Sequence, residues 1–226
     1  AEFAGGNARV SIALASRVQA DETLTNFSDD DLFKRLFSQR KDTTEQLLAS
    51  AEVLSIVYSF STSASEGNNE LSALAEMGGI ERSVLYRSQA ELLRRQVAQK
   101  RGDWRAVLPH ALANRLAKRA LQNIAIPDIN AVLFKPENLR LLKSSAHRLG
   151  YLHDFEPARL LAESWIEKDA PLAEVGSCCE DRIEALDFIA PVFPSTVLES
   201  LEVAAQNPEF TTRTNPHFSI IVRLLC

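Results

Sequence analysis

One histidine stands where an extended segment gives way to a helix. Residues 107–117 read VLPHALANRLA, so Pro109 ends the extended segment and His110 opens the helix that follows. An imidazole can donate a hydrogen bond to a phosphate oxygen, and its charge changes near physiological pH. The chemistry of His110 at this position is therefore compatible with a phosphate contact. The simpler interpretation is that His110 binds a backbone carbonyl and only fastens the extended segment to the helix.

Basic residues gather in one part of an otherwise acidic chain. The net charge of the 226 residues is −5, yet residues 82–119 hold ten Arg or Lys against only Glu91 and Asp103. Seven of the ten precede the helix of His110: Arg82, Arg87, Arg94, Arg95, Lys100, Arg101 and Arg105. Such a block suits contacts with the phosphates of nucleic acid, and it also suits contacts with an acidic neighbouring domain.

The remaining polar residues form no familiar catalytic or metal-binding motif. His147 and His153 are six positions apart, whereas two zinc ligands on one helix stand four apart, and the adjacent Cys178 and Cys179 rarely bind one ion together. The sequence contains no G-x-x-x-x-G-K-[ST] phosphate-binding loop and no G-x-S-x-G nucleophile motif. We therefore predict no metal site, no catalytic residue and no ATP hydrolysis by this chain alone.

The composition indicates a globular protein from a reducing compartment. Hydrophobic residues make up 46% of the chain, which suffices for a sizeable core. Its three cysteines provide no disulfide framework, and no signal peptide or bilayer-spanning apolar run is present. These features favour a cytoplasmic protein without membrane contact. Because the chain begins Ala-Glu-Phe rather than with Met, we expect it to be part of a larger protein.

Positioning His110 requires a helix, a ribbon and a second helix. The sequence predicts a helix at about 83–95, followed by a two-stranded ribbon over 97–108 with its turn at Arg101-Gly102-Asp103. In the second strand, an exposed Arg105 is expected to alternate with large apolar residues. Beyond the ribbon, an apolar stripe of helical period predicts a helix with one buried face, at residues 112, 113, 116, 117, 120 and 121.

The whole chain divides into three predicted regions, and its fold class is mainly α. Residues 43–123 predict a winged-helix domain with a small β-hairpin, in which helices precede the ribbon. Its first helix is expected at 43–60, with Tyr58 on the buried face. The flanking regions are a helical lid-like segment at 1–42 and helical hairpins, stacked as in a solenoid, at 124–226.

These features together resemble part of a signal-transducing ATPase of the STAND class, whose relatives include the NACHT and NB-ARC proteins. In NB-ARC proteins, a Met-His-Asp motif ends the ribbon of the winged-helix domain, and its histidine contacts the β-phosphate of ADP in the resting form. Pro109-His110-Ala111 resembles this motif, with Pro in place of Met and Ala in place of Asp. Because the acidic residue of the motif is missing here, any role of that residue in locking the resting state is in doubt for this chain.

A second correspondence lies near the start of the chain. GGNARVSIALA at 5–15 resembles the helical lid that follows the P-loop core of AAA+ and STAND ATPases, which implies that Arg9 is a sensor-like nucleotide contact. The resemblance covers about residues 1–123, and the helical pairs after it match the arm that commonly follows. It implies ATP or ADP with Mg²⁺ in the larger protein only, an upstream P-loop domain, and a homo-oligomer formed on nucleotide exchange, as in bacterial antiphage defence sensors.

Two other functions remain open. The basic block would make the chain a winged-helix DNA-binding regulator if it contacts phosphates, although the negative net charge weighs against this function. A purely structural adaptor of helical hairpins would follow if both nucleotide correspondences are accidental.

Overall fold

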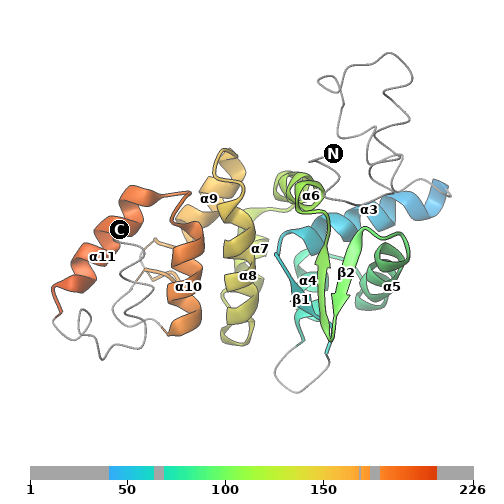
Figure 1. Cartoon of the computed structure of the whole chain (residues 1–226), viewed down its shortest axis with the longest axis horizontal. Coiled ribbons are helices and arrows are strands. Elements are labelled where there is room, and N and C mark those ends of the chain that lie inside the picture. The colour runs from blue at the N-terminus through green and yellow to red at the C-terminus, as the bar shows by residue number, and fades with distance from the viewer. Residues whose placement is uncertain (1–40, 64–68, 168, 174–178, 208–226) are drawn as a thin grey trace, which may run out of the picture. The chain divides into compact units, whose positions relative to one another are not determined.

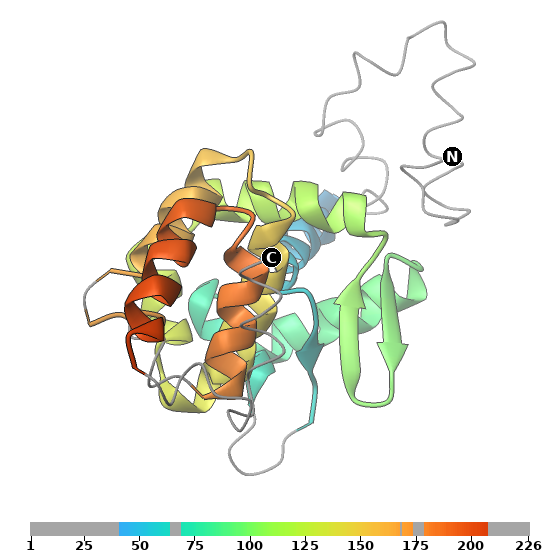
Figure 2. The same ribbon diagram turned by 60° about the vertical axis from the view of Figure 1, so that its left-hand side comes forward.

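The computed structural model describes residues 41–63, 69–167, 169–173 and 179–207 (Figure 1, Figure 2). This part of the chain is mainly helical and contains a three-stranded antiparallel sheet, so the mainly α fold class is confirmed. None of its helices has the length and apolar character needed to cross a membrane. The lid-like segment expected at 1–42, including Arg9, lies outside the described residues except for its last two positions.

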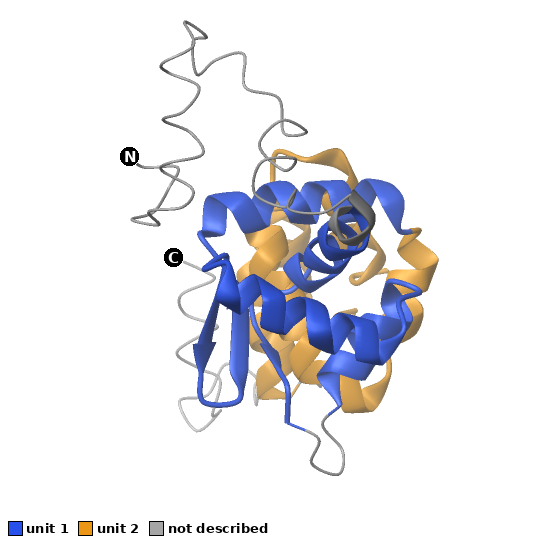
Figure 3. Ribbon diagram, turned by 90° about the vertical axis from the view of Figure 1, so that its right-hand side faces the viewer, with its two compact units in different colours: residues 1–124 blue, residues 125–226 orange. Residues whose placement is uncertain are grey.

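The chain divides into two compact units, residues 1–124 and 125–226 (Figure 3). The described elements of the first unit are α3 (Lys41–Ser55), β1 (Phe60–Ser61), α4 (Glu70–Met77), α5 (Arg82–Arg94), β2 (Ala98–Arg101), β3 (Trp104–Val107) and α6 (His110–Asn123). Strands β1 and β2 both pair antiparallel with β3, which is therefore the central strand. Gly102 turns the β2–β3 hairpin at a φ of +60°, a conformation that favours glycine. The hairpin expected at 97–108 is thus confirmed.

The helix expected at 43–60 ends earlier than predicted. α3 stops at Ser55, and the chain then enters β1, which pairs with β3. The backbone N–H of Ser61 in this strand donates a hydrogen bond to Glu70 Oε2 at 2.6 Å. Pairing with a distant strand and a distant carboxylate thus satisfies backbone groups that a longer helix would have satisfied locally. Tyr58 consequently lies in the connection after α3 and outside the helix.

Helix α6 buries one face and packs against α3. Its buried residues are Leu112, Ala113, Leu116, Ala117, Ala120 and Leu121, which confirms the predicted stripe. α3 brings a buried face of its own, with Leu47, Ala51 and Leu54 all at most 5% exposed. Because His110 is the first residue of α6, this packing also sets the position of its backbone.

An ion pair joins the polar edges of the same two helices. Arg119 Nε donates a hydrogen bond to Glu52 Oε1 at 2.8 Å, and Asn123 Nδ2 donates to Glu52 Oε2 at 3.3 Å. The Glu52 side chain is only 9% exposed, so its charge depends on these donors in place of water. The pair therefore helps to select one relative rotation of α3 and α6.

We predict that Glu52→Gln lowers the free energy of unfolding by about 1–3 kcal/mol, because a neutral amide weakens the charge-assisted hydrogen bond from Arg119. Urea denaturation measures the change. Glu45→Gln, at an exposed position of α3, is the matched control and should change the stability by no more than about 0.5 kcal/mol. Equal midpoints for Glu52→Gln and the wild type would contradict the stabilising role of the ion pair.

The described elements of the second unit are α7 (Ile126–Leu133), the 3-10 helix η2 (Pro136–Asn138), α8 (Leu139–Gly150), α9 (Glu156–Ser164), α10 (Glu180–Ile189) and α11 (Pro194–Ala205). α8 packs against α10, and the two approach closely at Gly150, where an added Cβ would lie 2.4 Å from the carbonyl oxygen of Phe188. The helical character expected beyond residue 124 is confirmed for the described residues. Stacking of hairpins as in a solenoid stays a prediction.

Candidate functional site

His110 is exposed at the N-terminus of α6. Pro109 occupies the N-cap position in an extended conformation, without a side-chain hydrogen bond to the first turn, and that turn contains no acidic residue. The backbone N–H groups of a first turn and the positive end of the helix dipole both attract anions. The surroundings of His110 therefore suit a phosphate group.

The ring of His110 stacks on the ring of Tyr58. The two ring centroids are 4.8 Å apart with an angle of 15° between the planes, and Tyr58 Oη lies 3.2 Å from His110 Nε2. Tyr58 comes from the connection between α3 and β1, so two segments distant in sequence meet at this point. The contact with Tyr58 restricts the orientation of the imidazole. The simpler interpretation, in which His110 hydrogen-bonds a backbone carbonyl, did not include this contact.

The direction of the hydrogen bond between Tyr58 and His110 determines which imidazole nitrogen carries the proton. A neutral imidazole carries one donor nitrogen and one acceptor nitrogen. When the Tyr58 hydroxyl donates to Nε2, the ring proton resides on Nδ1, which is then the donor.

Tyr58 is the residue of this site that sequence reasoning missed. The expected helix over 43–60 placed it on a buried helical face, whereas the structure places it, half-buried, beside His110. The run Ile-Val-Tyr-Ser-Phe-Ser at 56–61 carries β-branched and aromatic residues that favour extended structure. That enrichment was the available signal that the helix ends before Tyr58.

The seven residues of the predicted basic block separate into two kinds. Five are exposed on α5 and the adjoining hairpin: Arg82, Arg87, Arg94, Lys100 and Arg101. The other two, Arg95 and Arg105, are buried, with exposures of 6% and 9%. Because α5 packs against β2, the exposed members occupy neighbouring elements. Of the seven residues of the basic block, only these five are exposed.

The burial of Arg105 corrects the predicted alternation of β3. We expected Arg105 to be exposed, and this prediction was wrong, because β3 is the central strand and Arg105 shares a face with the buried Val107. Its Nη1 donates hydrogen bonds to the carbonyl oxygens of Gly102 and Trp104, at 2.8 and 2.9 Å. Trp104, on the opposite face, is 41% exposed. Arg105 therefore stabilises the hairpin turn.

Glu91 binds two arginines of the block within α5 and at its end. Arg95 Nε lies 2.6 Å from Glu91 Oε1, and Arg94 Nη2 lies 2.7 Å from Glu91 Oε2. Hydrogen bonds from Arg95, and secondarily from Arg94, hold the pKa of Glu91 below its ordinary value. The carboxylate offsets positive charge at this end of α5, so the surface charge of the block is smaller than its composition indicates.

We predict that the protein loses stability as the pH falls through the depressed pKa of Glu91. The contribution of this carboxylate is fully present above its unfolded pKa, about 4.3, and disappears once the folded-state carboxyl is protonated. Glu91→Gln should flatten the fall of the melting temperature below about pH 4.3. Glu45→Gln, at an exposed position of α3, is the control. The hypothesis fails if Glu91→Gln and the wild type lose stability in parallel over this range.

The histidines and cysteines of the second unit form no metal site among the described residues. No group of three or more His, Cys, Asp or Glu in those ranges is arranged to hold an ion. His147 instead stacks on Phe188, with ring centroids 4.1 Å apart, while His153 is exposed. Cys178 lies outside the described residues, and Cys179 is an exposed free thiol.

Comparisons of the chain with protein-family models, with curated proteins and with solved structures found no match. The interpretation of the site therefore depends on its own residues. These place His110 and Tyr58 together, place five members of the basic block at the surface, and bury Arg95 and Arg105.

Proposed function

We propose that the chain is the regulatory part of a nucleotide-switched ATPase of the STAND class. In this proposal the first unit provides a winged-helix domain, and the second belongs to a solenoid-like helical arm. The observation that supports it is the exposed His110 at the start of α6, stacked on Tyr58 where a helix N-terminus attracts anions. The nucleotide and its Mg²⁺ belong to an upstream P-loop domain of the same protein, and Arg9 would supply a second contact.

His110 acts in this proposal as a nucleotide-dependent latch. In the resting protein it donates a hydrogen bond to a phosphate oxygen of ADP and keeps the winged-helix domain beside the nucleotide. A hydrogen bond to a charged group contributes about 1.5–3 kcal/mol, which changes an equilibrium roughly tenfold or more. Exchange of ADP for ATP removes the preference for the closed arrangement, and the open protein assembles into a homo-oligomer. Bacterial antiphage defence is the setting that the resemblance suggests.

Tyr58 compensates in this proposal for the missing acidic residue of the family motif. Ala111 stands where NB-ARC proteins carry Asp, and its methyl group cannot orient a histidine by hydrogen bonding. The Tyr58 ring and hydroxyl contact the imidazole from another segment and restrict its rotation. Tyr58, which is distant in sequence but close in space, thus positions the His110 ring in place of the residue that follows the histidine in the family motif.

We predict that His110→Ala accelerates ADP release from the full-length protein about tenfold or more and shifts it towards the oligomer. Stopped-flow release of a fluorescent ADP analogue measures the first effect, and size-exclusion chromatography with light scattering measures the second. Tyr58→Phe keeps the stacked ring without its hydroxyl and should give a smaller increase. His153→Ala, an exposed histidine of the second unit, is the control. An unchanged rate of ADP release in His110→Ala would eliminate the latch.

Nucleic-acid binding by the first unit is the second candidate function. A specific observation favours it, because α5 and β3 expose Tyr86 by 51% and Trp104 by 41% near the exposed cations of the basic block. Aromatic rings stack on bases, while Lys and Arg contact phosphates. The net charge of −5 and the pairing of Glu91 with two arginines weigh against it. The structural adaptor has no comparable observation in its favour.

We expect the wild-type chain not to bind duplex or single-stranded DNA at low salt. Fluorescence anisotropy over a salt series measures this, since a true phosphate-binding surface loses affinity with a log–log slope of about 0.9 per contact. Salt-dependent binding that Arg101→Ala weakens, with a slope reduced by about one, would favour the second candidate instead. Arg159→Ala, which removes the same charge from the second unit, serves as the comparison.

A further inference from the structure

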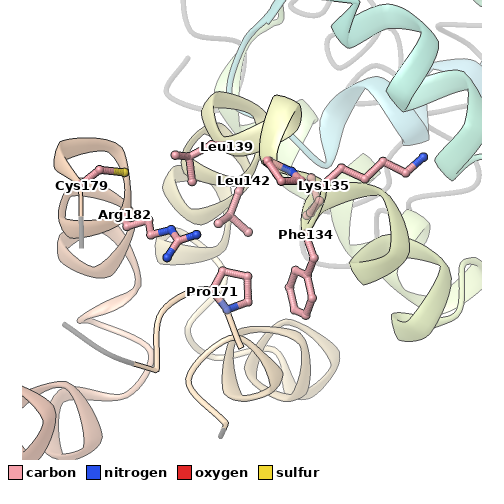
Figure 4. A pocket seen from close by; sticks show the side chains of 9 residues that line it. Phe134, Lys135, Leu139, Leu142, Pro171, Cys179 and Arg182 are labelled. Atoms are coloured by element: carbon pink, nitrogen blue, oxygen red, sulfur yellow. The ribbon is translucent and has the colours of Figure 1, made fainter. Parts of the chain in front are cut away.

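The second unit contains a pocket that the proposed function does not use. Its volume is about 270 Å³, just below the range of roughly 300–1,000 Å³ for small-molecule sites. Leu139 and Leu142 from α8, Phe134 after α7, and Pro171 provide an apolar lining (Figure 4). The start of α10 supplies the polar side, where Arg182 is the basic residue.

Arg182 is the polar group that the pocket is built around. Figure 4 shows its guanidinium directed between Leu142 and Pro171 into the pocket. Its Nε is buried and has no hydrogen-bond partner among the described residues. The guanidinium makes no hydrogen bond or ion pair with the described residues, so its outer nitrogens can donate to an acceptor that enters the pocket.

Among the described residues of the pocket lining, Arg182 is the one cation that is directed into the pocket. Lys135 also lines the pocket, but Figure 4 shows its ammonium directed away from the other lining side chains. Asp181, in the first turn of α10, forms an ion pair with Lys143, and that turn also carries the exposed Glu180. A single guanidinium in the pocket matches one negative charge, so it suits a monoanion better than a phosphate, which carries up to two charges.

We propose that this pocket binds a small monocarboxylate with an apolar body. A guanidinium matches a carboxylate in planar, bidentate geometry, so the head group of the ligand binds Arg182. The apolar body then lies against Phe134 and Leu139, where burial of its carbon atoms adds affinity. A linear acid of about six carbons fits the small volume.

Isothermal titration of the full chain with hexanoate tests the proposal. Hexanoate should bind, whereas hexanamide, which lacks the charge, and inorganic phosphate, which lacks the apolar body, should bind at least about tenfold more weakly. Arg182→Gln should weaken hexanoate binding about tenfold or more, and Phe134→Ala should weaken it severalfold. The matched controls are Arg159→Gln and Leu160→Ala, which alter an exposed charge and an exposed apolar side chain of α9.

Several results would overturn the proposal. The proposal fails if hexanoate does not bind to the wild type. It also fails if the affinity for hexanoate is unchanged in Arg182→Gln. If phosphate binds as tightly as hexanoate, the pocket is a general anion site and the monocarboxylate proposal is wrong. Circular dichroism confirms the fold of each variant. If Arg182→Gln fails to fold, Arg182→Lys keeps the charge without the paired planar donors and should still lose affinity severalfold.

Discussion

The packing of α6 on α3 is the contact on which the rest of the first unit depends. The buried stripe of α6 contains three leucines and three alanines, and each fully buried leucine contributes about 1.5–3 kcal/mol. A helix with one apolar stripe still has freedom to rotate slightly, and the ion pair of Glu52 with Arg119 opposes that rotation. Since β3 is followed directly by α6, this one contact locates both the sheet and the start of the helix.

The position of His110 is a consequence of this packing. Its backbone belongs to the first turn of a helix whose other turns are anchored, and its ring stacks on Tyr58 from the connection between α3 and β1. The side chain is exposed, yet its orientation is restricted by a stacked ring and a hydrogen bond. Such preorganisation lowers the entropy that a ligand must remove on binding. This combination distinguishes His110 from His153, which is also exposed.

Features that depend on local periodicity were predictable from the sequence. The six apolar positions of α6 recur at helical spacing, and all six are buried as predicted. The hairpin was predictable because Gly102 permits its turn. Features that depend on distant partners were not predictable, above all the strand β1, which exists because β3 lies beside it. The wrong end of the first helix, the misplaced Tyr58 and the wrong exposure of Arg105 all follow from that one missing strand.

The two units present different kinds of polar site. His110 is a surface group at a helix N-terminus, suited to a partner that arrives and leaves with a change of domain arrangement. The guanidinium of Arg182 is directed into a largely apolar pocket, which suits a small ligand instead. Composition drew attention to the basic block, but burial and the pairing with Glu91 remove part of its charge from the surface. A single histidine is therefore more informative than the seven basic residues.

The NMR signal of the His110 ring tests the proposed nucleotide latch, because it reports the environment of the ring with and without added nucleotide. The chain has four histidines, so comparison with His110→Ala assigns the signal within the labelled protein. If His110 is the latch, its ring resonances shift when ADP binds and return towards their nucleotide-free values when ATP replaces ADP. Ring resonances that remain the same in the nucleotide-free, ADP-bound and ATP-bound states would contradict the proposal.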